Sequence, residues 1–479
     1  MDEAQVEVEP TRGRQLGFWQ QLSYAMGNFG VAFSPTVVAA WLGYFYYGQE
    51  TDSGEPIVYI GTTTFGILWF ICNALNGPTD PIVGYLSDHT RSRWGRRKPW
   101  VFVGAPFLAL SFFFLWTPVT DTPSVANAAV LFASLFGFWL FFTVVVAPYL
   151  SMLPDITPYD DERVRVSAFM AGFEVLGTIM GNLLPPLFAS LLAGGLLFLG
   201  SGYQVMAFVV GVTLVLFFWG SVLFVRERYT FSESRSSAGG GVGAAMREFG
   251  STLNNKPFRP YVVSVGFYRI AIATTVFIAP FISTKVLGGY EPHPTDVALL
   301  GVLGAVDEGV VNWELAAGYM MMLVMVGGAL FFPLVSWLAI RVGKKRLFMI
   351  ALCWFGVVLI LMGTLGEWPF FTPVVQAMCL FMLAAFPVSV ALVVLRPILA
   401  DVIDADEKLT GERREGVYNG MEGLIMKIAA GAGPLGAGFV FAAFGSTAGE
   451  NLGVRLCGPM AGVAVLLAAV AFSRYPIRK

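Results

Sequence analysis

Charged residues are scarce in this chain. Asp, Glu, Lys and Arg make up 13% of its 479 residues, whereas hydrophobic residues make up 56% and the mean hydropathy is +0.68. A soluble protein carries about a quarter charged residues because its surface faces water. We therefore expect most of this surface to face lipid. The net charge of −2 offers no excess of either sign that would indicate a nucleic-acid partner.

Cysteine and histidine are also rare. Four cysteines without paired spacing and two histidines in predicted loops exclude a disulfide framework and a metal cluster. The chain lacks a Ser/His/Asp set and a GxxxxGK[ST] loop, which argues against an enzyme and against ATP-driven transport. We expect no cofactor beyond a coupling ion. Residues 1–17 are polar and predict a cytoplasmic tail, not a cleavable signal peptide.

Long apolar stretches dominate the remainder. A spanning helix needs about 20 apolar residues, and twelve stretches meet this requirement: 18–48, 58–87, 99–119, 124–153, 166–198, 203–225, 258–288, 314–341, 347–366, 372–402, 416–446 and 453–473. The expected fold is an all-α membrane protein with twelve transmembrane helices. The polar, Ser/Gly-rich interval 226–257 predicts a flexible linker between two six-helix bundles, 18–225 and 258–473, followed by the tail 474–479.

The distribution of basic residues predicts the orientation. With both termini and the linker on one side, that side holds nearly all Lys and Arg residues, and the opposite loops hold almost none. The positive-inside rule makes the basic side cytoplasmic. We expect a multi-pass protein of a plasma membrane or a bacterial inner membrane, with both termini in the cytoplasm.

The two halves repeat each other. Asp80-Pro81 leads into Gly95-Arg96-Arg97-Lys98, and Pro333-Leu334 leads into Gly343-Lys344-Lys345-Arg346. Pro148 precedes Glu162-Arg163 by nearly the same spacing as Pro397 precedes Glu412-Arg413. Two related six-helix halves are typical of an alternating-access transporter with its site near the midplane.

Charged motifs recur at the cytoplasmic helix ends. Such charges can lock one access state and separate in the other, although positive-inside topology alone also explains basic loops. The predicted cytoplasmic gate comprises Gly84, Asp88, Arg91, Arg93, Gly95, Arg96, Arg97, Lys98, Asp155, Glu162, Arg163, Arg396, Asp401, Arg413 and Arg414. Arg396, which precedes Pro397, and Glu422 are both expected within the membrane near the cytoplasm. Arg396 either belongs to an inner gate or forms a purely structural ion pair.

These motifs resemble those of a known family. The stretch from Asp80-Pro81 to Lys98-Pro99 resembles the signature of the major facilitator superfamily, in the form found in glycoside–pentoside–hexuronide:cation symporters. Three further stretches agree with it: 153–163, 255–258 and 400–416. Melibiose permeases and the lysophosphatidylcholine symporters of animals belong to that family. The resemblance implies the twelve-helix fold and solute transport.

Asp80 is the first candidate for cation binding. It lies roughly 12 Å deeper along its helix than Asp88, and Asn73, Asn76 and Asp80 follow an i, i+3, i+7 spacing that places them on one face. Carboxylate and amide oxygens suit a small hard cation. A lone carboxylate in lipid can instead carry a proton, or pair with another helix as a structural element.

The resemblance adds roles for other positions. It implies that Asp80 is a cation ligand, that Thr143 lies beside the cation, and that Lys427 lies between the cation and the substrate. Melibiose permeases have a second aspartate where this chain has Asn76.

Lys427 is expected deep in the eleventh helix, roughly 18 Å beyond Glu415. It is too deep to reach the interface easily, so it needs an anionic partner, and Asp80 is the natural one. The alternative is a lysine in a water-filled cavity without a coupling role. Glu174 and Arg269 either face the solute or pair with each other across the two halves.

The substrate is the least determined property. Melibiose permeases bind galactosides through acidic residues where this chain has Ala32 and Val146, so we do not expect that form of sugar recognition. The sequence favours a monomeric symporter that couples Na⁺ or H⁺ to a glycoside-like or other small organic solute. A lysolipid or amphipathic solute is the alternative within transport, and a non-transporting sensor is the alternative outside it.

Overall fold

The computed structural model describes residues 16–51, 54–157, 159–192, 194–196, 199–225, 250, 252–307, 309–411 and 414–476, with the backbone only for Asp88 and Asp160. Arg413, the Asp88 side chain, most of the predicted N-terminal tail and most of the predicted linker lie outside this part. The described chain is almost entirely helical. Its small hairpin pairs β1 (Val306–Asp307) with β2 (Val310–Val311).

The N-terminal half is built from eight helical segments. They are α1 (Phe18–Ala25), α2 (Gly27–Tyr47), α3 (Thr62–Asn76), α4 (Thr79–His89), α5 (Lys98–Phe114), α6 (Val125–Ile156), α7 (Asp160–Leu191) and α8 (Gly202–Leu223). Together they account for the first six predicted spans.

The C-terminal half supplies the other six. Its segments are α10 (Phe258–Phe281), the π-helical η1 (Ile282–Val286), η2 (Leu287–Gly289), α11 (Pro294–Val302), α12 (Trp313–Val342), α13 (Lys344–Leu361), η3 (Met362–Thr364), α14 (Pro373–Thr410), α15 (Glu415–Phe444) and α16 (Leu452–Ser473). α11 and the hairpin lie in the long loop between the seventh and eighth spans.

Ten helices of the described chain are long and apolar enough to cross a membrane. The other two predicted spans coincide with shorter helices. The third is α5, with 17 residues, and the second is divided into α3 and α4. The all-α membrane fold is confirmed.

A proline pair explains why the second span is divided. Pro78 and Pro81 have no N–H, so the carbonyls of Ala74 and Gly77 cannot receive their usual i+4 helical hydrogen bonds. The Gly77 N–H turns back to the Ala74 carbonyl at 3.2 Å, a tighter i+3 bond. The chain therefore ends one helix at Asn76 and begins another at Thr79.

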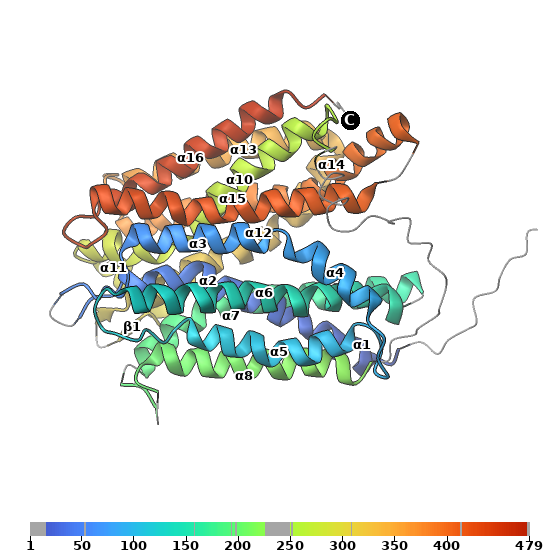
Figure 1. The fold of residues 1–479 in the computed structure, drawn as a ribbon. Coiled ribbons are helices and arrows are strands. Elements are labelled where there is room, and N and C mark those ends of the chain that lie inside the picture. Colours follow the sequence, from blue (N-terminus) through green and yellow to red (C-terminus); the bar gives the residue numbers. More distant parts are fainter. Residues whose placement is uncertain are drawn as a thin grey trace, which may run out of the picture.

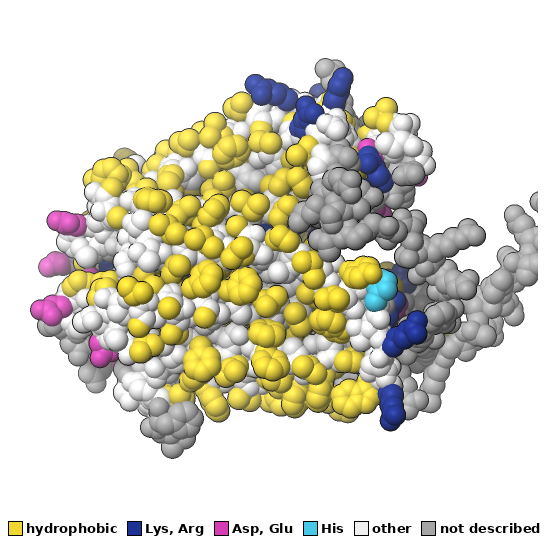
Figure 2. All heavy atoms as spheres, viewed as in Figure 1, with side chains coloured by type: hydrophobic (Ala, Val, Ile, Leu, Met, Phe, Trp, Pro, Cys, Tyr) yellow, Lys and Arg dark blue, Asp and Glu magenta, His cyan; other side chains and the backbone are white. Residues whose placement is uncertain are grey.

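Figure 1 shows the two halves stacked, with α13, α15 and α16 above and α5, α6 and α8 below. Figure 2 shows a broad hydrophobic belt between Lys and Arg side chains at the right end and Asp and Glu side chains at the left end. We call these the basic end and the acidic end. Chain direction places the start of α5 at the basic end and the loop after α2 at the acidic end.

Among the described residues, the most extensive contacts between the halves run along three helix pairs, α3 with α15, α2 with α10, and α7 with α12. Small residues allow the backbones to approach. A Cβ on Gly438 of α15 would lie 2.5 Å from the Thr62 carbonyl of α3, and one on Gly318 of α12 would lie 2.8 Å from the Asn182 carbonyl of α7. Thr62 begins α3 and Gly438 nears the end of α15, so this contact lies toward the acidic end.

An aromatic cluster fills the interface beside these contacts. The rings of Tyr47 and Phe281 stack at 5.5 Å between centroids, and those of Phe65 and Phe277 lie 6.0 Å apart. Phe441 joins both sides, 6.3 Å from Tyr47 and 5.0 Å from Phe281. These five rings are almost fully buried. They close the space between the halves near the acidic end.

Helix packing within the N-terminal half can be tested at one glycine. A Cβ on Gly177 of α7 would lie 2.6 Å from the Phe29 carbonyl of α2. We expect Gly177→Ala to destabilise the fold by about 1–3 kcal/mol, because the backbones must move apart. Thermal unfolding in detergent measures the effect.

Gly172 on the same helix provides the matched control, because a Cβ there meets no atom within 4 Å. Gly172→Ala should leave the melting temperature unchanged or raise it slightly, since alanine favours the helix. An equal melting temperature for both variants would contradict the close α2–α7 contact.

Candidate functional site

An ion pair joins the two halves near the middle of the molecule. The Lys427 ammonium of α15 lies 2.6 Å from the Asp80 Oδ1 of α4. The exposed fractions of the two side chains are 23% for Lys427 and 47% for Asp80. The pair is thus accessible to small ions and to water. Asp80 and Lys427, the charged residues that the sequence predicts deep in the membrane, therefore lie together.

Other oxygen atoms surround this pair. The Thr143 hydroxyl of α6 donates to Asp80 Oδ1 at 3.1 Å and lies 3.4 Å from Asn76 Oδ1. The Lys427 ammonium also donates to the Asn76 backbone carbonyl at 3.2 Å. The Thr79 hydroxyl donates to Asn76 Oδ1 at 2.6 Å. Carboxylate, amide, hydroxyl and carbonyl oxygens are the ligands that small hard cations prefer.

The division of the second span creates this arrangement. Asn76 is the last residue of α3, where backbone carbonyls lack helical partners, and Asp80 lies in the first turn of α4. A helix N-terminus stabilises a negative charge there. The break therefore brings the Asn76 carbonyl, which accepts from the Thr79 hydroxyl and the Lys427 ammonium, close to the Asp80 carboxylate.

Asn73 lies one turn further into α3 and is buried. Its side chain donates to the Trp69 carbonyl at 2.9 Å and packs against Gly431 of α15. Because the helix breaks after Asn76, the expected common face does not continue through Asp80. The hydrogen bonds described for Asn73 do not include Asp80 or Lys427.

Glu174 and Arg269 lie on helices of different halves, α7 and α10. Asn28 of α2 donates its amide to Glu174 Oε2 at 3.1 Å and to the Met170 carbonyl at 3.0 Å. Both Glu174 and Arg269 are exposed. The ion pairs of the described residues do not link Glu174 with Arg269 in this conformation.

At the basic end, the predicted gate residues of the N-terminal half form contacts within that half. Arg96 and Arg97 at the start of α5 reach Asp155 Oδ2 in α6 at 3.0 and 2.8 Å. Arg97 also binds the Ser151 carbonyl, and Lys98 binds the Val225 carbonyl. These bonds tie the third, fourth and sixth spans together.

The C-terminal half repeats this arrangement. Lys344 at the start of α13 pairs with Asp401 of α14, as Arg96 and Arg97 pair with Asp155. Arg414 binds Asp406 with two hydrogen bonds of 2.8 and 2.9 Å. The sequence repeat therefore corresponds to a repeated ion pair, and each pair braces its own half in this conformation.

The remaining gate candidates have other surroundings. Glu162 accepts a hydrogen bond from the Leu16 backbone N–H at 2.5 Å, and Arg163 donates to the Thr157 carbonyl at 3.2 Å. Arg396 donates to Asn419 at 3.2 Å within the C-terminal half, while Glu422 accepts from Tyr261 at 2.5 Å. Two arginines, Arg91 and Arg93, are exposed in the loop between α4 and α5. Gly95 lies in this loop with a φ of 110°, whereas Gly84 lies within α4.

Sequence reasoning missed two participants, the Thr79 hydroxyl and Asn28. The available signal for Asn28 was a polar side chain within an apolar span. The proline pair indicated the Asn76 carbonyl, because it marks where helical hydrogen bonds fail. The sequence carried no signal for the rotation of Thr79 toward Asn76.

Comparison with known proteins supports this architecture. A family model described as "MFS/sugar transport protein" matches residues 23–307 and 307–479, nearly the whole chain. An uncharacterized symporter of Synechocystis is 34% identical over 182 residues, covering 37% of this chain and 32% of the relative.

Two further relatives carry more specific names. The mouse sodium-dependent lysophosphatidylcholine symporter 1 is 30% identical over 37% of this chain and 33% of the relative. The isoprimeverose transporter of Lactiplantibacillus pentosus is 26% identical over 46% of this chain and 44% of the relative. The chain thus matches less than half the length of each of these relatives.

Solved structures of low identity share the fold. The nucleoside transporter NupG is 11% identical with a TM-score of 0.65, covering 97% of this chain and all of that one. A bacterial homolog of the human lysosomal transporter Spinster, in an inward-facing and occupied conformation, is 15% identical with a TM-score of 0.64 and 95% coverage of both chains. Family model, relatives and fold agree, and the chain belongs to the MFS/sugar transport protein family of multi-pass membrane transporters.

Proposed function

We propose that this protein is a symporter that couples the movement of a small organic solute to Na⁺ or H⁺ by alternating access. The observation that carries the proposal is the Lys427–Asp80 ion pair between the two halves, enclosed by oxygen ligands. A charged pair within the membrane is costly and is retained mainly where it has a function.

The geometry supports a direct coupling mechanism. Lys427 Nζ holds the position in which a cation would contact Asp80 Oδ1 and the Asn76 carbonyl. Na⁺ bound there, or a proton on Asp80, would weaken the attraction for the ammonium. Because α4 and α15 belong to different halves, ion binding would change the contact between the halves and thereby their relative stability in each access state.

The contacts between the halves indicate which side is open. The aromatic cluster and the close α3–α15 approach lie toward the acidic end, and the ion pairs described at the basic end remain within one half. With the basic end in the cytoplasm, this conformation corresponds to an inward-facing state. The solute would leave toward the basic end.

A sugar-like solute is the first candidate class. The family description and the name of the isoprimeverose transporter both refer to sugars. Asn28, Glu174 and Arg269 supply amide, carboxylate and guanidinium groups that can form hydrogen bonds with hydroxyls. These residues would contribute to recognition from both halves.

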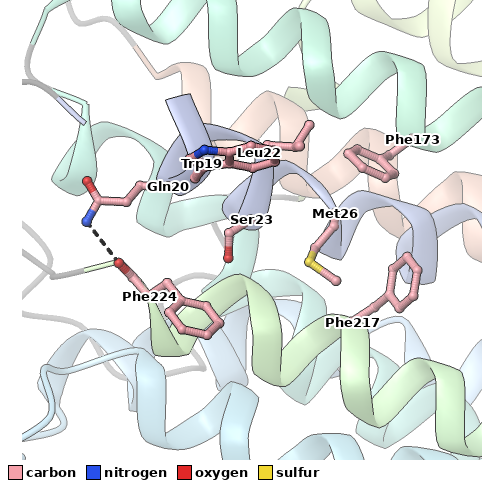
Figure 3. Close-up of a pocket in the computed structure, with 8 residues that line it drawn as sticks. All are labelled: Trp19, Gln20, Leu22, Ser23, Met26, Phe173, Phe217 and Phe224. Atoms are coloured by element: carbon pink, nitrogen blue, oxygen red, sulfur yellow. Dashed lines mark hydrogen bonds between the residues drawn. The ribbon is translucent and has the colours of Figure 1, made fainter. Parts of the chain in front are cut away.

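A lysolipid is the second candidate, supported by a separate observation. A cavity of about 510 Å³ at the start of the first span is lined almost entirely by apolar side chains, among them Trp19, Met26, Phe173 and Phe217. Figure 3 shows these side chains around the cavity, with Gln20 hydrogen-bonded to the Phe224 carbonyl at its edge. Such a surface would accept an acyl chain, and one relative is named as a lysophosphatidylcholine symporter.

Uptake into proteoliposomes tests the function. Sugars and lysolipids are offered in turn under an imposed Na⁺ gradient, an imposed H⁺ gradient, or neither. Accumulation of one solute class that requires one gradient supports the symporter and identifies its ion. Ligand binding without accumulation under any gradient would instead indicate a sensor.

Asp80 should be required for coupling. We expect Asp80→Asn to abolish gradient-driven accumulation, because the amide binds neither a proton nor Na⁺ with comparable strength. The measurement is solute uptake with and without the gradient. Glu291→Gln, which removes an exposed carboxylate from a loop at the acidic end, should retain full coupling. Unchanged coupling in Asp80→Asn would remove this carboxylate from the mechanism.

Thr143 should contribute a ligand oxygen. Its hydroxyl binds Asp80 and Asn76 side chains, so Thr143→Val should raise the ion concentration for half-maximal uptake by about tenfold or more. Thr143→Ser keeps the hydroxyl and should stay close to the parent protein. Equal ion dependence of the valine and serine variants would show that the hydroxyl has only a packing role.

A further inference from the structure

Glu314 connects the halves at the acidic end. It is the second residue of α12 in the C-terminal half. Its Oε1 accepts a hydrogen bond from the Tyr44 hydroxyl of α2 at 3.1 Å, and its Oε2 accepts one from the Tyr203 hydroxyl of α8 at 3.3 Å. Each carboxylate oxygen therefore binds a different helix of the N-terminal half.

Lys285 forms a second connection nearby. It lies in the π-helical η1 and is only 3% exposed. Its ammonium is 2.6 Å from Glu50 Oε1, which belongs to the segment that follows α2. A buried ammonium depends on its anionic partner, because burying a charge alone is strongly unfavourable. This pair also joins the C-terminal half to the N-terminal half.

A polar cavity of about 320 Å³ adjoins the Glu314 contact. Gln49, Ser201, Tyr203, Asn312 and Glu314 line it, so residues of both halves contribute. The cavity is large enough for water molecules, which could replace the tyrosine hydroxyls as partners of the carboxylate. The contact can therefore open without leaving Glu314 unsatisfied.

We propose that Glu314 with Tyr44 and Tyr203, and Lys285 with Glu50, form an outer gate of two polar latches above the aromatic cluster. Opening toward the acidic end requires both latches to separate, because each one spans the two halves. Their combined strength sets the ratio of outward-facing to inward-facing molecules. This inference rests on the alternating access proposed above.

The chain offers a matched control at the same end. Arg455 of α16 lies 3.7 Å from Glu367, which precedes α14. Both residues belong to the C-terminal half, so this ion pair does not cross the interface. Its removal changes the charge of the acidic end without weakening either latch.

Distances between spin labels test the gate. Val125 begins α6 in the N-terminal half and Val302 ends α11 in the C-terminal half, with exposed fractions of 86% and 87%. Labels on Val125→Cys and Val302→Cys, in a chain whose four native cysteines are replaced by alanine, report the separation of the halves by double electron–electron resonance. The solute and ion gradients are omitted.

We expect Glu50→Gln and Glu314→Ala each to raise the ratio of long to short distances by about tenfold, since the first removes the negative charge that pairs with Lys285 and the second removes the acceptor of both tyrosine hydroxyls. The double variant should exceed either single variant, and Glu367→Gln should match the parent. The charge exchange Glu50→Lys with Lys285→Glu should restore the parent distribution, which also shows that the changed chains still fold.

An unchanged distribution in the double variant would overturn the outer gate. A charge exchange that keeps the long distances would overturn the ion-pair latch. Because these distances need no solute, the result is independent of the uptake assay. A shift in distances without any solute accumulation would leave the gate standing and reject the symporter.

Discussion

One constraint organises this molecule: an ammonium and a carboxylate within an apolar protein must neutralise each other. Lys427 and Asp80 come from different halves, so their attraction is also a force between the halves. Any ion that competes for Asp80 changes that force. In the proposed mechanism, ion binding and opening would therefore depend on the same pair of charged groups, and the surrounding oxygens of Thr143 and Asn76 would determine which ion competes well.

Ion pairs inside each half connect its helices to one another. Arg96 and Arg97 brace the first half through Asp155, and Lys344 braces the second through Asp401. Contacts between the halves are of a different kind, with close backbone approach at small residues and a limited set of polar bonds. Ion pairs within each half, together with weaker contacts between the halves, suit a motion in which one half rotates against the other.

Hydropathy was sufficient to predict the membrane spans and their division into two halves, because a bilayer leaves few alternatives to apolar helices. The pairing of Lys427 with Asp80 was also predictable, since each deep charge needs an opposite one. The role expected for Asn73 rested on a continuous helix, and the break after Asn76 removes that premise. Glu314, Asn28 and Thr79 depend on how helices rotate and pack against each other, which no local pattern specifies.

The interruption at Gly77-Pro78 has a mechanical consequence. α3 packs along α15 of the other half and also along α6, whereas α4 packs mainly along α6, so the two pieces of one span share only one of their main neighbours. A bend at this junction would let α4 tilt while α3 keeps its contacts with α15. Asp80 lies in the first turn of α4, just past this junction. The other end of α4 leads into the basic loop. A small displacement of Asp80 would therefore become a larger displacement at the basic end of α4.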